Sequence, residues 1–115
     1  TSLDVSKNTA LTKLWCNHNN LTSLDVSKCT ALTKLSCGGN NLTSLDVSKN
    51  TALTHLTCHN NKLSASALNK IFDDLPQGKK VNDGYYNQST IYIYNNPGTN
   101  TCDKSIATNK GWRVQ

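Results

Sequence analysis

The chain has 115 residues, which is enough for one domain with a modest core and too few for two independent ones. Twelve Lys and Arg residues against seven acids, all of them Asp, give a net charge of +5. The basic residues recur singly, as at Lys7, Lys28 and Lys49, rather than clustering on one face, so we expect no nucleic-acid partner. Because no segment reads as a signal peptide or a membrane span, we also expect no membrane insertion by this chain.

A 21-residue repeat organises the first half of the chain. The segments LTKLWCNHNNLTSLDVSKCTA (11–31), LTKLSCGGNNLTSLDVSKNTA (32–52) and LTHLTCHNNKL (53–63) align without gaps, and residues 1–10 supply the second half of an earlier unit. Each unit opens with L-x-x-L-x-C-x-x-N-x-L, the leucine-rich-repeat signature with cysteine in its third apolar position. The chain begins inside a repeat, and we therefore expect it to be a fragment of a longer repeat protein.

Inward and outward side chains alternate within each repeat. Leu14 and Cys16 alternate with Lys13, Trp15 and Asn17, which places the first set inward and the second outward on a short strand. Successive units are expected to stack these strands in parallel at about 4.8 Å. The second half, LTSLDVSKN, alternates again, so we expect strand-like structure on both sides and little helix between repeats. The predicted fold is a leucine-rich-repeat solenoid of 21-residue parallel β-sheet coils, mostly β, with a helix-containing C-terminal cap.

Two columns of equivalent residues are expected inside the solenoid. The first is a core ladder made of the signature cysteines and an isoleucine with the same spacing: Cys16, Cys37, Cys58 and Ile93. Three thiols at the strand spacing cannot all pair, and disulfides need closer Cβ atoms, so we interpret these thiols as reduced and packed in the core. The second is a turn ladder, whose amides pair the backbone groups that the bend leaves open: Asn19, Asn40, Asn61 and Asn96.

The regular pattern changes after Leu63. Apolar residues at helical spacing follow Ser64 and stop at Pro76, which predicts a helix over about 65–75. Turn signals then predict a loop over 76–89, the repeat frame returns in a strand over about 90–94, and Asp103 is expected to cap a short helix over about 103–110. Trp112 and Val114 are expected to close the end of the core. We thus divide the chain into repeat coils at 1–63 and a capping region at 64–115, continuous with the same solenoid.

The repeat words and the closing segment resemble those of bacterial surface leucine-rich-repeat proteins of the internalin type. The resemblance rests on LTSLDVSKNTAL, the cysteine in a 21-residue repeat and IYIYNNPGTNTCDKSIATNKGW, and it covers essentially the whole chain. It implies a secreted or cell-surface bacterial protein that binds host or bacterial molecules with a curved sheet, and it implies no particular ligand. One departure is Cys29, which stands where Asn8 and Asn50 stand in the other repeats.

The outward strand positions are the candidate binding face. They form three rows, and exposed Trp and Tyr residues there offer large rigid contacts to a protein or a carbohydrate. An alternative for Trp15 is that the ring covers the end of the repeats or packs on neighbouring lysines. An alternative for the whole protein is a structural spacer or stalk that presents another domain. The candidate ligand-binding residues are Lys13, Trp15, Asn17, Lys34, His55, Thr57, His59, Tyr92 and Tyr94.

The remaining polar residues favour no chemistry. His55 and His59 are about 13 Å apart along one strand, too far to share an ion, and we interpret them as solvated histidines. The column Asp4, Asp25 and Asp46 is interpreted as a solvated face with loop hydrogen bonds. No catalytic motif occurs and Glu is absent, so we expect no enzyme, no cofactor and no metal site.

Two expectations concern contacts outside the fold. Cys29 and Cys102 lie outside the core ladder, and we expect them to be exposed thiols or halves of a crosslink to another part of the protein. The repeats lack an N-terminal cap, which exposes a strand edge and apolar core, so we also expect self-association through that end.

Overall fold

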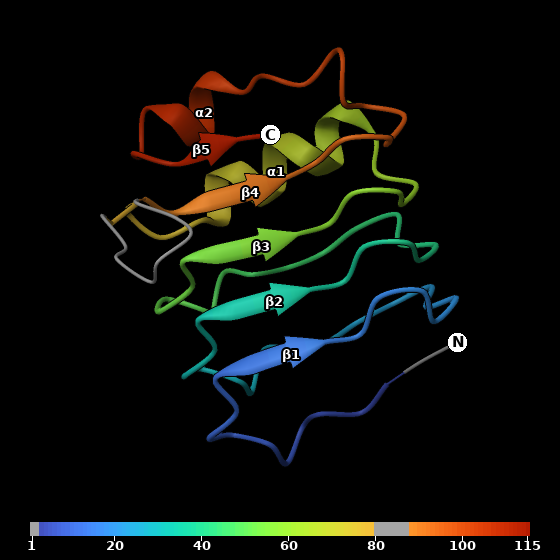
Figure 1. Cartoon of the computed structure of the whole chain (residues 1–115), viewed down its shortest axis with the longest axis vertical. Coiled ribbons are helices and arrows are strands. Elements are labelled where there is room, and N and C mark those ends of the chain that lie inside the picture. Colours follow the sequence, from blue (N-terminus) through green and yellow to red (C-terminus); the bar gives the residue numbers. More distant parts are fainter. Residues whose placement is uncertain (1–2, 80–87) are drawn as a thin grey trace.

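The protein is described by a computed structural model, which places residues 3–79 and 88–115. Within them, five short strands form one parallel sheet in the order β1-β2-β3-β4-β5 (Figure 1). The strands are β1 Lys13–Trp15, β2 Lys34–Ser36, β3 His55–Thr57, β4 Thr90–Tyr92 and β5 Arg113–Val114. The register follows the repeat, because Leu14 aligns with Leu35, Leu35 with Leu56, and Leu56 with Ile91. The predicted solenoid of parallel coils is therefore confirmed.

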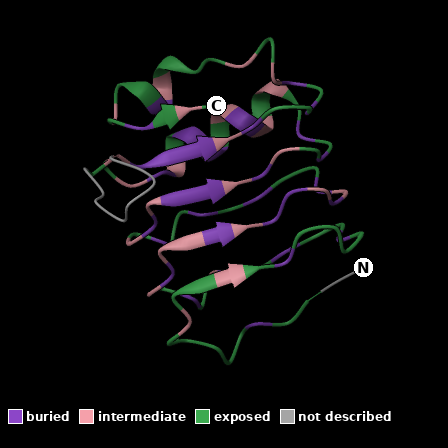
Figure 2. Ribbon diagram, viewed as in Figure 1, coloured by how far each residue is buried: buried purple, intermediate pink, exposed green. Residues whose placement is uncertain are grey.

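The core lies between the sheet and the segments that return behind it. Leu35, Leu56 and Ile91 point inward from the sheet and are 1% exposed or less. Val26 and Val47 face them from the returning segments and are equally buried. Figure 2 shows the resulting gradient, with buried strands in the middle of the sheet and a more exposed β1. Each coil buries its apolar residues against its neighbours, as expected of a solenoid.

The returning segments are less strand-like than the alternation predicted. We call the three LDVSK segments at 3–7, 24–28 and 45–49 the return side. Its ladder among the described residues is a single bridge, between Asp4 and Asp25. The reason is local, because the Oδ1 atom of Asp25 accepts a hydrogen bond from the backbone N–H of Ser27, 2.9 Å away. That N–H is thus used within the segment and is not offered to a neighbouring coil.

The helix α1, Ala65–Asp74, lies behind the sheet at the β4 end (Figure 1). The Ser64 hydroxyl caps it by accepting a hydrogen bond from the Ala67 N–H at 3.2 Å, as the sequence predicted. Leu68, Ile71 and Phe72 are fully buried against the core. The helix ends one residue before the expected 75, because Leu75 has an extended backbone ahead of Pro76.

The side chain of Lys110 supports the end of α1 from a distant part of the sequence. Its Nζ donates hydrogen bonds to the carbonyls of Phe72, Asp73 and Leu75. The Phe72 carbonyl also accepts the Leu75 N–H at 3.3 Å, and a cation at this end of the helix opposes the negative pole of the helix dipole. Sequence analysis did not assign Lys110 this role, since nothing local links it to residues almost 40 positions earlier.

The closing segment differs from the prediction in three details. Helix α2 is Ser105–Thr108, shorter than the expected 103–110, because Asp103 forms a turn before it and accepts hydrogen bonds from the N–H and hydroxyl of Ser105. Strand β4 ends at Tyr92 rather than 94. The chain also adds β5, which sequence analysis did not predict, since two residues carry too little alternation to register as a strand.

Trp112 closes the core next to β5. It is 1% exposed, and its indole Nε1 donates to the Pro76 carbonyl at 2.8 Å. The predicted loop over 76–89 falls mainly on residues outside the described ranges. No helix of the described residues has the length and apolar character needed to cross a membrane.

Candidate functional site

The outward strand positions line up in the rows that the sequence predicted. Lys13, Lys34, His55 and Thr90 pair in register, and so do the residues two positions further along. This second row crosses the middle of the sheet and consists of Trp15, Ser36, Thr57 and Tyr92. We call the outward positions of β1 to β5, with the residue that follows each Cys or Ile of the core ladder, the sheet face.

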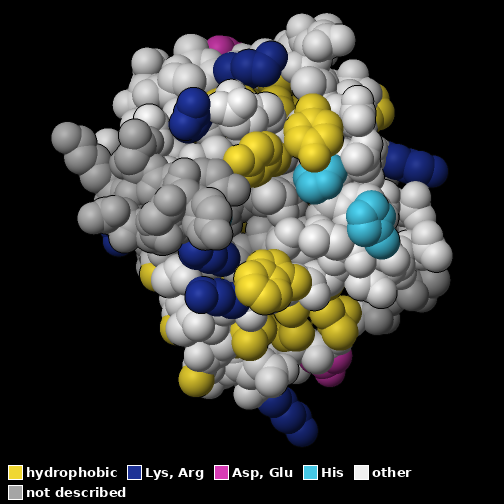
Figure 3. Space-filling view, viewed as in Figure 1, with side chains coloured by type: hydrophobic (Ala, Val, Ile, Leu, Met, Phe, Trp, Pro, Cys, Tyr) yellow, Lys and Arg dark blue, Asp and Glu magenta, His cyan; other side chains and the backbone are white. Residues whose placement is uncertain are grey.

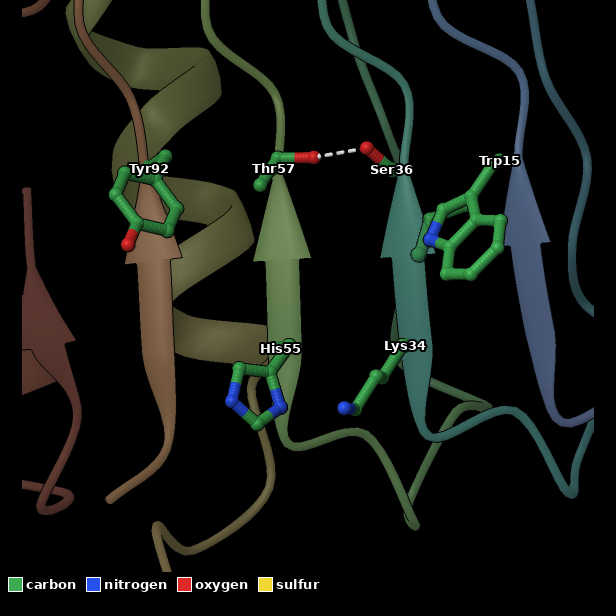
Figure 4. Close-up of a pocket in the computed structure, with 7 residues that line it drawn as sticks. Trp15, Lys34, Ser36, His55, Thr57 and Tyr92 are labelled. Atoms are coloured by element: carbon green, nitrogen blue, oxygen red, sulfur yellow. Dashed lines mark hydrogen bonds between the residues drawn. The ribbon is translucent and has the colours of Figure 1, made fainter. Parts of the chain in front are cut away.

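A groove lies across the sheet face between its two aromatic ends. Its volume is about 270 Å³, with Trp15 on one side and Tyr92 on the other. Trp15 is 71% exposed, and Figure 4 shows its ring leaning over β2. The remaining lining residues are Lys34, Leu35, Ser36, His55 and Thr57. Lys34 lines the groove together with Trp15, so packing of the ring on neighbouring lysines stays an alternative to a binding role.

Ser36 of β2 and Thr57 of β3 form the polar floor of the groove, and a chain of hydrogen bonds continues from them to Asn17, which follows β1. The hydroxyls of Ser36 and Thr57 are 2.6 Å apart (Figure 4). Ser36 also donates to the Oδ1 atom of Asn17 at 3.1 Å, and the same Oδ1 accepts the Gly38 N–H at 2.7 Å. Because a hydroxyl has one proton and Ser36 gives its proton to Asn17, Thr57 must donate to Ser36. Asn17 therefore has a structural part in the face besides its predicted place in a binding surface.

Two histidines lie over the glycines of the middle coil, beyond the groove. A Cβ atom on Gly38 would lie 2.4 Å from the His59 ring, and one on Gly39 would lie 2.2 Å from Nδ1 of His18. The imidazoles therefore occupy the space that side chains of the middle coil would need. The middle coil has only glycines at these two positions, and the structure fills the space above them with histidine rings.

A column of left-handed residues explains why His18 has this place. The equivalent residues His18, Gly39, Asn60 and Asn95 have φ values of 59°, 71°, 53° and 60°. This conformation favours Gly and Asn and tolerates His, which are the residue types found there. Sequence analysis missed the column, although its composition carries the signal.

His59 belongs to an aromatic cluster at the far end of the face. Its ring stacks on Tyr94 with centroids 4.5 Å apart and planes 16° from parallel, and Tyr94 meets Tyr92 edge to face at 6.5 Å. Burial, with a smaller contribution from the charge of His18, lowers the pKa of His59. Burial among the neighbouring groups therefore disfavours the charged form of this ring.

His55 does not match its interpretation as a solvated histidine. It is 8% exposed, and its Nδ1 lies 2.9 Å from the hydroxyl of Thr54. Thr90, next to it in the first row, is also buried at 1% exposure. The strand register predicts that both side chains point outward from the sheet. Neither is exposed, because burial also depends on residues that lie far away in sequence.

The cysteine ladder is confirmed as a column of reduced thiols. Cys16, Cys37 and Cys58 are 3% exposed or less and form no disulfide. The Sγ atoms of Cys16 and Cys37 lie 3.5 and 3.3 Å from carbonyls of the next strand, which they meet as weak donors. Burial raises the pKa of each thiol, to about 12 for Cys58. A thiol that stays protonated is a poor nucleophile and a poor metal ligand.

Cys29 was expected to be an exposed thiol or half of a crosslink, and that is wrong. It is fully buried and free, and its Sγ points to the Val5 carbonyl at 3.7 Å. Asn50 makes the equivalent contact one coil later, donating to the Val26 carbonyl at 3.0 Å. Cys29 therefore fills an asparagine slot as a weaker donor. Cys102 is partly exposed and free, with its Sγ at 3.4 Å from the Thr99 carbonyl.

The turn ladder is present and buried in three of its four members. Asn40, Asn61 and Asn96 are 5 to 8% exposed, whereas Asn19 is exposed. The Oδ1 of Asn40 accepts the N–H groups of Asn19 and Leu21, and its Nδ2 donates to the Cys16 carbonyl. Each buried amide thus pairs backbone groups of the preceding coil, which fixes the edge of the sheet face.

The aspartate column makes the predicted loop hydrogen bonds. Asp4, Asp25 and Asp46 each accept the N–H of the serine two residues later at 2.8 to 2.9 Å. Hydrogen bonding to the side chain of that serine, and then to its backbone N–H, lowers the pKa of all three carboxyls. Among residues 3–79 and 88–115, no three His, Cys or Asp side chains gather closely enough to hold a metal ion.

The repeat, the single parallel sheet and the ladders give the described residues the leucine-rich-repeat fold that the sequence predicted. A family model described as Leucine Rich repeats (2 copies) matches residues 9–50. No curated protein sequence matches the chain.

A solved structure adds a particular likeness. It is described as the functional domain of InlJ from Listeria monocytogenes, which includes a cysteine ladder. It is 34% identical to this chain, covers 92% of it and superimposes with a TM-score of 0.64. This chain in turn spans 20% of the length of that one. The predicted resemblance to internalin-type repeats with a cysteine ladder is thereby confirmed.

Proposed function

We propose that the protein is a non-enzymatic binding module that recognises a protein or a glycan on the sheet face, in a secreted or cell-surface bacterial protein. The observation that carries the proposal is Trp15, 71% exposed at the side of a groove. A tryptophan left in water forgoes the stabilisation that its burial would bring, about 1.5–3 kcal/mol for a large side chain. A partner that covers the ring recovers that free energy, which is why Trp is enriched at the centres of interfaces.

The aromatic cluster at the end of the face opposite Trp15 supports the same proposal. Tyr92, Tyr94 and His59 hold one another in place through ring contacts, so they are rigid before any partner arrives. Rigid aromatic groups lose little conformational entropy on binding. The likeness to the functional domain of InlJ favours a binding role. The bacterial surface location and the protein or glycan partner are proposed together with it.

The test is a binding screen against immobilised glycans and cell-surface proteins, with variants on the two sides of the solenoid. We expect Trp15→Ala to weaken every genuine hit at least tenfold without changing the unfolding midpoint, because the ring is exposed. Lys49→Ala, on the return side, is the control and should bind like the wild type. If hits persist unchanged in Trp15→Ala and in a His59→Ala, Tyr94→Ala double variant, the sheet face is not the binding site.

A spacer remains the second candidate, because the outward residues of the return side are identical in each coil. Identical coils suit a stalk, which needs only length to hold another domain at a distance. A spacer predicts no reproducible hit in the screen, and the same experiment therefore separates the two functions.

A further inference from the structure

The groove between Trp15 and Tyr92 has apolar sides and a hydrogen-bonding floor. Trp15 is 71% exposed, so its ring is available to a flat apolar surface. The ring of a pyranose sugar has such a surface, made of C–H groups, and carries hydroxyls around its rim. The volume of about 270 Å³ suits one or two sugar rings better than a folded protein surface.

The polar groups of the floor match a ligand with many hydroxyls. In the hydrogen-bond chain from Thr57 through Ser36 to Asn17, Thr57 uses its only proton and keeps lone pairs that accept a ligand hydroxyl. Asn17 accepts both of its bonds with Oδ1, so the donors of its NH₂ group are not used in this chain. The face therefore presents an acceptor and a donor close together. Such a chain of bonds also polarises its members, which strengthens the next bond added.

The charge of the face favours an anionic ligand. Lys13 and Lys34 are adjacent in the first row, and Arg113 lies in the same row on β5. No described outward position of the five strands is acidic, and the described acids lie elsewhere: Asp4, Asp25, Asp46, Asp73, Asp74 and Asp103. Figure 3 shows this separation, with lysines beside the aromatic groups and acidic side chains only at the margin. The seventh acid, Asp83, lies outside the described residues.

An acidic peptide fits the groove less well than an acidic sugar. Extended peptides are bound through main-chain hydrogen bonds at a free strand edge. The groove lies over β2 and β3, whose backbone groups are already used in the ladders to β1 and β4. A peptide would gain only side-chain contacts there, whereas a sugar uses its ring face and its hydroxyls together.

We propose that the groove binds an acidic oligosaccharide, with one ring against Trp15, hydroxyls on Thr57, Ser36 and the adjoining Asn17, and a carboxylate at Lys34. This inference rests on the proposed function, because it names the ligand class of the same face. The carboxylate lies at the side of the groove that Lys34 lines, where Lys13, its neighbour in the first row, adds to the local positive potential.

The probes are a galacturonic-acid trisaccharide and sialyllactose, with their carboxyl-reduced trisaccharide and lactose as neutral counterparts. Calorimetry or NMR titration at low and at physiological salt should show each acidic probe binding at least tenfold more tightly than its neutral counterpart. The preference should shrink as salt rises, because it is electrostatic. Equal affinity for acidic and neutral sugars overturns the carboxylate assignment.

Three variants separate the parts of the proposal. Trp15→Ala should lose at least tenfold in affinity for acidic and neutral sugars alike, whereas Trp15→Phe should retain part of it. A Lys13→Gln, Lys34→Gln double variant should lose about tenfold for acidic probes only, and Lys28→Gln, Lys49→Gln on the return side should lose nothing.

A hexaglutamate peptide distinguishes charge from sugar recognition. Binding of hexaglutamate but not of either acidic sugar overturns the inference and leaves the proposed function standing. If neither acidic sugar binds while another hit of the screen depends on Trp15, the inference alone falls. If no hit depends on Trp15, the proposed function falls with it.

Discussion

The sheet face and the return side are built from the same repeats and differ in what their outward residues do. The three segments of the return side have the same sequence, LDVSK, and their aspartates accept hydrogen bonds from the serines two residues later. On the sheet face the second row changes from Trp15 to Ser36 to Thr57 to Tyr92. The Asp and Ser residues of the return side form the hydrogen bonds of their own turns, which restricts the residue types allowed there. Most sheet-face residues do not stabilise a turn. The difference teaches that the outward residues of the sheet face can change between coils because the residues of the return side stabilise the coil.

The two asparagine slots sharpen this contrast. At the end of the sheet face, buried amides continue without a break from Asn40 through Asn61 to Asn96. At the end of the return side, Cys29 interrupts the series and donates only weakly to the Val5 carbonyl. More buried hydrogen bonds therefore fix the end of the sheet face than fix the turn of the return side. A surface that binds a partner needs such a fixed geometry.

The largest effect is expected from removing an amide of the sheet-side ladder. In Asn61→Ala, the Leu42 N–H loses its buried acceptor, while the Cys37 and Cys58 carbonyls lose one donor each and keep those of Asn40 and Asn96. Urea unfolding should show a loss of about 2–5 kcal/mol, since an unpaired buried group costs about 1–3 kcal/mol and each lost hydrogen bond about 0.5–1.5 kcal/mol. Asn19→Ala is the matched control, because Asn19 is exposed and should change stability by less than about 1 kcal/mol. Equal losses in the two variants would contradict a buried ladder.

A second prediction concerns the glycine beneath His18. Gly39→Ala should destabilise by about 1–3 kcal/mol, because its φ of 71° strains an alanine and its Cβ would lie 2.2 Å from Nδ1 of His18. Adding His18→Ala should recover the steric part and leave the backbone part. Asn60→Gly, at the same position of the next coil, keeps a suitable residue at φ 53° and should be close to neutral. Thermal unfolding measures all three, and a neutral Gly39→Ala would show that His18 moves away freely.

A third prediction restores the interrupted series on the return side. In Cys29→Asn, the amide Nδ2 should replace the weak thiol bond to the Val5 carbonyl with a full hydrogen bond. We expect a gain of about 0.5–1.5 kcal/mol in the free energy of unfolding, the usual net value of one hydrogen bond. The reverse change, Asn50→Cys, should lose a similar amount. A loss of stability in Cys29→Asn would mean that the slot prefers thiol packing to a second donor.

The smallest effect is expected from the carboxylates of the return side. Hydrogen bonds from serine place the folded pKa of Asp4, Asp25 and Asp46 below the ordinary value of 3.8. The stability that these carboxylates add is therefore present above about pH 4, and it is lost as the pH falls through the folded pKa. A triple Asp→Asn variant keeps the turns but removes the titration, so its urea midpoint should fall less steeply between pH 5 and pH 2. Parallel pH profiles would show that the exposed carboxylates contribute nothing.

The sequence predicted most of the fold because the repeat specifies the structure of each coil. A period of 21 with Leu14, Cys16 and Asn19 at fixed spacing specifies strand, core column and turn in each coil, and each coil contacts only its neighbours. Stacking then needs no knowledge of distant contacts. Strand β5 was missed because two residues carry too little alternation, and the contact of Lys110 with the end of α1 was missed because it joins residues far apart in sequence.

The candidate face shows the same division between local pattern and tertiary contact. By itself the sequence determined which side chains point outward, because alternation and the repeat decide direction. Only the tertiary structure decided how far each is exposed, burying His55 and leaving Trp15 71% exposed. It also decided that Ser36, Thr57 and Asn17 join into one chain of hydrogen bonds, and that His18 and His59 fill the space above the glycines. Direction is a property of one strand, whereas exposure and contact are properties of everything packed around it.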